Sequence, residues 1–87
     1  MALNFPNSNR SYDPARRGVR FWGHESVMEC IFFMTEEAFR RIRPNLQSSE
    51  AGFLSAFDAN RDLIYAAATK AYSRGRKPSY ELLVSDF

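Results

Sequence analysis

The sequence predicts an α+β fold, an antiparallel sheet of about four strands with two helices packed on one face. Segments that alternate apolar and polar residues occupy both ends of the chain, and two segments of helical periodicity lie between them. Hydrophobic residues make up 45% of the 87 and include eight Phe, which is typical of a compact globule rather than a disordered chain. We therefore expect a single domain over residues 1–87 with the order β-β-β-α-α-β.

The N-terminal part is expected to supply the first two strands. Leu3 and Phe5 alternate with their neighbours and predict a short edge strand, which a polar connection over residues 7–18 follows. A second strand begins at Gly18, and residues 23–26 are expected to turn it back as a hairpin.

The third strand, Val27–Met34, is apolar on both faces, a pattern typical of a strand that is covered on both sides. Two helices on one face of the sheet leave the second face open. Trp22, the N-terminal loop or a second subunit must then cover it, and the last of these alternatives would be a homodimer through the uncovered sheet face.

The first helix begins at the N-cap Thr35, has acidic residues in its first turn and ends before Pro44. Ser48 or Ser49 then caps a long helix that is expected to reach Ser73.

Gly75 stands where a left-handed C-cap would end the long helix. Residues 80–85 alternate again and predict the last strand. Its neighbour in the sheet is left open by the sequence.

A polar layer interrupts the apolar stripe of the long helix. Phe57 and Ile64 are seven residues apart, and Asn60 and Arg61 lie between them. A buried guanidinium needs a partner, and Asp58 is spaced to pair with it on the helix surface. We favour a structural anchor formed by these polar residues, or by Arg61 and a carboxylate of the last strand, over an Arg held ready for an anionic ligand.

Two groups combine cations with aromatic residues. Arg20 and Trp22 share one face of the second strand, and Arg74, Arg76 and Lys77 follow the long helix. Both groups could contact an anion, a base or a partner protein. Both also have structural explanations, since cations favour helix C-termini and Arg can lie over a Trp ring.

The chain offers little for catalysis. His24, the single His, falls in the expected hairpin turn, and Cys30, the single Cys, falls in the apolar strand. The glycines are too scattered for a phosphate-binding loop. We expect no catalytic set, no metal site and no cofactor.

Charge and hydropathy exclude further classes. The net charge of +2 is too small to draw the chain onto nucleic acid or membrane by field alone. No apolar run approaches the ~18 residues of a membrane span, and one Cys fits a reducing compartment. We therefore expect a cytoplasmic protein with no membrane contact.

A set of short motifs, in this order and spacing, gives the chain a family resemblance. They are Leu3-Asn4-Phe5-Pro6, Tyr12-Asp13, Gly18-Val19-Arg20-Phe21, Thr35-Glu36-Glu37-Ala38, Phe57, Asn60-Arg61, Ile64, Ala68, Gly75, Leu82 and Asp86-Phe87. With them the chain resembles the short bacterial proteins of domain-of-unknown-function family 1488. The resemblance implies a small, self-contained α+β bacterial domain and assigns no activity, cofactor or catalytic residue.

Three functions remain open. The first expectation is a small non-enzymatic binding or protein-interaction domain. The alternative is a protein that binds nucleic acid or another polyanion through Arg20, Trp22, Arg74, Arg76 and Lys77. An enzyme that uses Arg61 is the least favoured.

Overall fold

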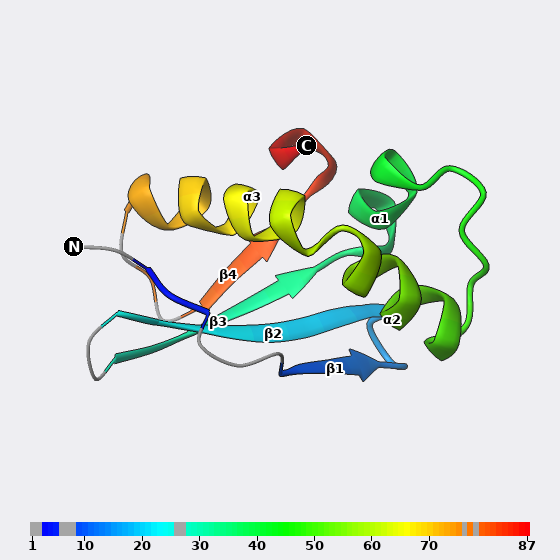
Figure 1. Ribbon diagram of the computed structural model, residues 1–87, viewed down its shortest axis with the longest axis horizontal. Coiled ribbons are helices and arrows are strands. Elements are labelled where there is room, and N and C mark those ends of the chain that lie inside the picture. Colours follow the sequence, from blue (N-terminus) through cyan, green and yellow to red (C-terminus); the bar gives the residue numbers. More distant parts are fainter. Residues whose placement is uncertain (1–2, 6–8, 26–27, 76, 78) are drawn as a thin grey trace.

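The computed structural model describes residues 3–5, 9–25, 28–75, 77 and 79–87, which form a four-stranded sheet, three α-helices and one 3-10 helix (Figure 1). In chain order the elements are β1 (Arg10–Asp13), β2 (Gly18–Glu25), β3 (Met28–Met34), α1 (Glu36–Ile42), α2 (Glu50–Ala59), α3 (Arg61–Ser73), β4 (Ser79–Leu82) and η1 (Val84–Asp86). The α+β class is confirmed. No helix in this part of the chain is long and apolar enough to cross a membrane.

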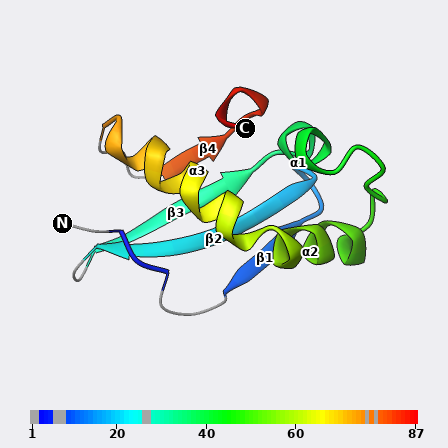
Figure 2. The same cartoon turned by 45° about the horizontal axis from the view of Figure 1, so that its top comes forward.

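The sheet is mixed, so the expected purely antiparallel sheet is wrong. Its strand order is β1-β2-β3-β4, with antiparallel pairs β1–β2 and β2–β3 and a parallel pair β3–β4. The three helices form a crossover, and α3 carries the chain back over the sheet to the end at which β3 begins (Figure 2). Strand β4 therefore starts at that end and runs in the direction of β3.

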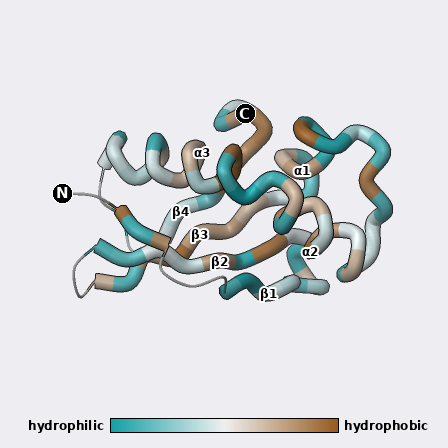
Figure 3. The backbone as a smooth tube through the Cα atoms, in the orientation of Figure 1, coloured by the Kyte–Doolittle hydropathy of each residue, from teal (hydrophilic) through white to brown (hydrophobic). Residues whose placement is uncertain are grey.

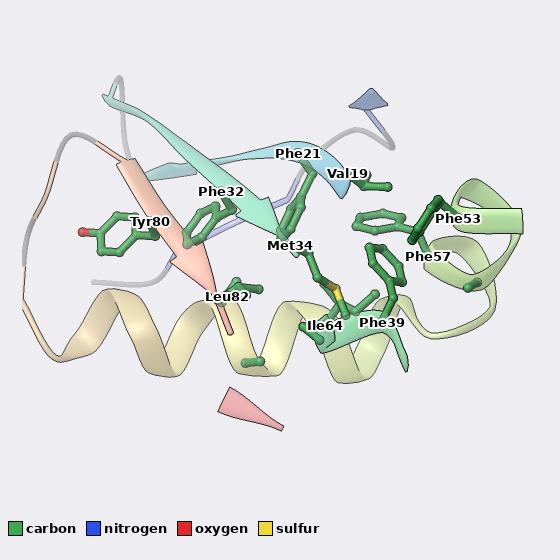
Figure 4. Close-up of a cluster of buried hydrophobic side chains, with 14 of the residues drawn as sticks. Val19, Phe21, Phe32, Met34, Phe39, Phe53, Phe57, Ile64, Tyr80 and Leu82 are labelled. Carbon is green, nitrogen blue, oxygen red and sulfur yellow. The ribbon is translucent and has the colours of Figure 1, made fainter. Parts of the chain in front are cut away.

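All three helices lie on one face of the sheet, where they enclose a core rich in Phe (Figures 1 and 4). Phe21 stacks on Phe32 with ring centroids 5.3 Å apart, and Phe57 from α2 packs on Phe21 at 5.1 Å. Ile64 of α3 and Leu82 of β4 are fully buried in the same cluster. Aromatic pairs at these separations stabilise the core beyond the area that they bury.

Strand β1 lies inside the segment that was expected to be a polar connection. Tyr12 of β1 stacks on Phe53 of α2 at 5.4 Å, and Arg10 forms an ion pair with Asp58. These contacts with α2 are long-range, so the local pattern of residues 7–18 could not indicate the strand.

The segment expected to be the first strand lies beside β2 but forms only a single bridge with it, and the Phe5 side chain packs on the helix side of the sheet. Asn4 forms one isolated bridge with His24, and Phe5 stacks on Tyr65 with centroids 4.0 Å apart. Gly23 permits the close approach of Phe5, because a Cβ atom there would lie 2.9 Å from the Phe5 ring.

Gly23 is thus a close-approach position within β2 and not the start of a turn, so the hairpin expected over residues 23–26 was placed too early. The strand continues to Glu25. Ser26 and Val27, where the turn and the start of the third strand were expected, lie outside the described residues.

The single long helix that was expected is wrong, because the chain leaves helical geometry at Asn60. Its φ of −127° and ψ of 27° make Asn60 both the C-cap of α2 and the N-cap of α3. Its side-chain amide donates to the carbonyl of Ala56 at 2.9 Å, which occupies an acceptor that a continuing helix would use. Figure 3 shows the polar junction in teal between α2 and α3.

The two expected N-caps are confirmed. The Thr35 hydroxyl accepts a hydrogen bond from the N–H of Ala38, and the Ser49 hydroxyl accepts one from Gly52. Each satisfies a donor that the first helical turn leaves free.

The C-terminal expectations need correction. Gly75 has no positive φ and is not a left-handed cap, and Arg74 in αR geometry is the C-cap of α3. The Gly75 carbonyl instead accepts a hydrogen bond from the Tyr80 hydroxyl at 3.1 Å. Strand β4 ends at Leu82 rather than continuing to residue 85, because the Asp86 carboxylate accepts from the N–H of Leu83 and holds the chain in η1.

Candidate functional site

The face of the sheet opposite the helices carries the candidate site, and no described helix covers it (Figures 1 and 2). We call it the open face. Alternation along the paired strands assigns to it Ser11, Asp13, Arg20, Trp22, His24, Glu29, Ile31, Phe33, Ser79 and Glu81.

One edge of the open face is organised by Asp13. Its carboxylate accepts hydrogen bonds from the backbone N–H groups of Ala15 at 3.0 Å and Arg16 at 3.1 Å. It also pairs with the Arg20 guanidinium at 3.0 Å. The N–H of Arg16, together with the other donors and cations, lowers the pKa of the Asp13 carboxyl. A charged Asp13 therefore fixes the turn between β1 and β2.

This turn directs Arg16 across the sheet. The Arg16 guanidinium carbon lies 3.9 Å from the centre of the Phe33 ring, and an amino group donates to Glu81 of β4 at 3.0 Å. Arg16 therefore links the β1–β2 turn to the far edge strand and covers a buried aromatic ring.

The Phe33 ring also packs closely on Gly18. A Cβ atom at Gly18 would lie 2.4 Å from the ring and 2.4 Å from the carbonyl oxygen of Met34. Only glycine fits at this position, so Gly18 and Arg16 both pack on the Phe33 ring.

The centre of the open face is less protected. Trp22 and Ile31 are directly opposite each other on β2 and β3, and both are half-buried. Among the described residues, Arg16 of the β1–β2 turn lies over the Phe33 ring, and no residue of this turn makes a cation–π contact with Trp22. Trp22 and Ile31 therefore form the apolar centre of the open face.

A hollow of about 660 Å³ lies beside β4, and we call it the β4 hollow. Its walls combine open-face residues with the end of α3 and with η1. The charged members are Arg16, Arg20, Arg74, Lys77, Glu81 and Asp86. Four cations thus meet two carboxylates, which gives the hollow a positive excess.

Most of these cations already have partners in the chain. Arg20 pairs with Asp13, and Arg74 pairs with Asp86 at 3.2 Å. The ammonium group of Lys77 is exposed and forms no ion pair with the described residues. Lys77 is therefore the cation in the hollow that is best placed to meet an external anion.

Asp58, Asn60 and Arg61 lie on the helix side of the sheet, away from the open face. Asp58 binds Arg61 at 2.7 Å and Arg10 of β1 at 2.8 Å. Arg61 also donates to the Tyr65 hydroxyl at 2.6 Å, and its guanidinium lies over the Phe57 ring.

The hydrogen bond from Arg10 is the main cause that lowers the pKa of Asp58, and Arg61 adds to it. These contacts connect β1, α2 and α3 at the break between the helices. We propose a structural role for this cluster, as an anchor that sets the angle between α2 and α3.

The carboxylate of Glu36 joins the β1–β2 turn to α1. Glu36 pairs with Arg17 at 3.3 Å and with Arg40 at 3.0 Å, and it accepts from the Ser48 hydroxyl at 3.1 Å. The Arg40 hydrogen bond is the largest cause that lowers the pKa of Glu36. Arginine–carboxylate pairs thus hold both ends of the β1–β2 turn.

The chain matches a family model over residues 3–84, nearly its whole length, and the model describes a protein of unknown function, DUF1488. The chain belongs to the DUF1488 family. No curated protein and no solved structure matches this DUF1488 chain.

The structure brings the two predicted cationic groups of this DUF1488 chain together in part. Arg20 lines the same hollow as Arg74 and Lys77, whereas Trp22 lies on the open face outside the residues that line it. Arg76 lies outside the described residues.

The sequence reasoning missed the contact of Arg16 with Phe33 and Glu81, and the role of Asp13 in placing it. The dipeptide Asp13-Pro14 signals a turn, but nothing local indicates a contact between residues 65 positions apart. No group of three or more His, Cys, Asp or Glu in the described part of the DUF1488 chain could hold a metal ion.

Proposed function

We propose that this chain is a small non-enzymatic interaction domain of the bacterial cytoplasm that forms a homodimer through its open face. The observation that supports it is the pair Trp22 and Ile31, half-buried side by side at the centre of a sheet face that no described helix covers. Large aromatic residues at the centre of an interface contribute most to binding, and charged residues belong at its rim.

The charges of the open face suit a second copy of the same chain. Around the apolar centre, Arg20 is balanced by Asp13, and Arg16 is balanced by Glu81. A twofold interface places one patch against itself, so a patch of a single sign would repel its copy. A patch that carries both signs in pairs avoids this repulsion.

Sedimentation velocity over a dilution series tests the proposal. We expect the wild-type protein to form dimers as its concentration approaches about 100 µM, and Trp22→Ala to weaken the dimer at least tenfold, because a central Trp typically contributes more than ~2 kcal/mol. Leu63→Ala is the matched control, since Leu63 is an exposed apolar residue on α3, on the opposite side of the sheet. A wild-type monomer throughout the series, or a dimer indifferent to Trp22→Ala, would refute the proposal.

A second function, the binding of nucleic acid or another polyanion, is favoured by one observation. Arg20, Arg74 and Lys77 line a single hollow, so one strand of phosphates could contact all three. The carboxylate partners Asp13 and Asp86 oppose this function, because they already neutralise the two arginines. Retention on a heparin column at low salt would support it, and elution without retention would exclude it.

The contacts of Arg61 favour a structural role over an enzymatic one. Its guanidinium is bound to Asp58 and to the Tyr65 hydroxyl and lies over the Phe57 ring. The single thiol, buried at Cys30, supports the cytoplasmic location.

A further inference from the structure

Strand β4 is the outer strand of the sheet on the side of the β4 hollow, and its backbone carries groups that the sheet does not use. The carbonyl of Leu82 accepts from the N–H of Thr35, so the backbone of Leu82 faces β3. Backbone groups of alternate residues point to opposite sides of a strand. Tyr80 therefore also faces β3, and the N–H and C=O groups of Ser79 and Glu81 face the outer edge.

The hollow lies along this edge. Ser79, Tyr80 and Glu81 line it, together with the end of α3 and the η1 segment. Ala71 and Leu83 add apolar surface to its walls. The hollow thus combines a free strand edge with room for side chains beside it, which is what an added strand requires.

The charges select the chemistry of the added strand. Four cationic side chains and two carboxylates line the hollow, and the Lys77 ammonium has no ion-pair partner among the described residues. An extended segment with carboxylates would match this excess, whereas a basic segment would meet Arg74 and Lys77 unfavourably.

We propose that the β4 edge binds an extended acidic peptide segment as a fifth strand, with its backbone paired to Ser79 and Glu81 and a carboxylate beside Lys77. Main-chain hydrogen bonds give such a complex its affinity, and alternate side chains give it selectivity. The hollow meets the apolar centre of the open face at Ile31, whereas Trp22 lies outside it. Pairing along the outer edge of Ser79 and Glu81 does not require the proposed homodimer.

The probe is a fluorescein-labelled peptide of about eight residues, the length of an ordinary strand, with alternating Asp and Val. Fluorescence anisotropy should show saturable binding that weakens with salt. The matched control peptide has the same sequence with an N-methyl group on every backbone nitrogen, which keeps the charges and removes the N–H donors from both edges of the strand. We expect the methylated peptide to bind at least tenfold more weakly.

Protein variants test the charge. Lys77→Glu should weaken peptide binding about fivefold, the scale of one exposed ion pair. Lys70→Glu is the control, because Lys70 is an exposed lysine on α3 that does not line the hollow. Both variants should keep the wild-type circular dichroism spectrum.

Amide hydrogen exchange tests the pairing directly. The amides of Ser79 and Glu81 should exchange rapidly in the free protein and become protected when the peptide saturates it.

Equal binding of the methylated peptide, or unchanged exchange at both amides, would overturn the proposal. Binding of a single-stranded oligonucleotide without binding of the peptide would also overturn it, in favour of the polyanion function. Sedimentation reports on the dimer separately, so the two proposals can fail independently.

Discussion

Replacing Gly18 by alanine should destabilise the protein by forcing Phe33 and Arg16 out of their contact. The added Cβ would lie 2.4 Å from both the Phe33 ring and the carbonyl oxygen of Met34, against 3.4 Å for an ordinary contact. A displacement of about 1 Å is therefore required, and the carbonyl belongs to the sheet backbone. Overpacking of this kind costs about 1–3 kcal/mol.

Urea unfolding followed by circular dichroism measures this loss. With a slope of about 1 kcal/mol per molar for a domain of this size, the midpoint should fall by roughly 1–3 M. Gly75→Ala is the matched control, because no atom lies within 4 Å of its Cβ position and its φ is not positive. It should leave the midpoint unchanged or raise it slightly. A loss below about 0.5 kcal/mol for Gly18→Ala would refute the packing described for Phe33.

Two further predictions concern the arginine–carboxylate pairs. The pKa values of Asp13, Glu36 and Asp58 are lowered in the folded state. The three carboxylates therefore stabilise the fold fully at pH values above their unfolded-state pKa of roughly 4. This stabilisation is lost as the pH falls through their folded-state pKa values. Thermal unfolding between neutral and acidic pH should show this loss, and a flat profile would contradict the pairing. Asp58→Asn should cost about 0.5–2 kcal/mol in urea unfolding, because it weakens two partly exposed pairs, with Arg10 and Arg61, and no loss would show that the cluster is not an anchor.

Local signals in the sequence predict the features that local physics determines. Thr35 and Ser49 cap helices because a hydroxyl can reach an N–H three residues ahead. The polar pair Asn60 and Arg61 marks a real feature, and the structure identifies it as a break between two helices rather than a layer inside one.

Features that depend on distant contacts could not be predicted. The direction of β4 follows from the path of three helices, and strand β1 depends on contacts between its Arg10 and Tyr12 and helix α2. At the candidate site, Arg20 and Trp22 were identifiable as a cation beside an aromatic residue. The packing of Arg16 on Phe33 could not be identified, because it depends on the conformation of the β1–β2 turn.

The most direct test of the proposed interface is the acrylamide quenching of Trp22 fluorescence across a protein dilution series. Trp22 is the single tryptophan of the chain and lies at the centre of the open face, so its fluorescence reports on this surface alone. Dimer formation through the open face predicts that the quenching constant falls, and the emission shifts to the blue, as the protein concentration rises. A quenching constant that stays unchanged at concentrations where sedimentation detects dimers would place the interface elsewhere and contradict the proposal.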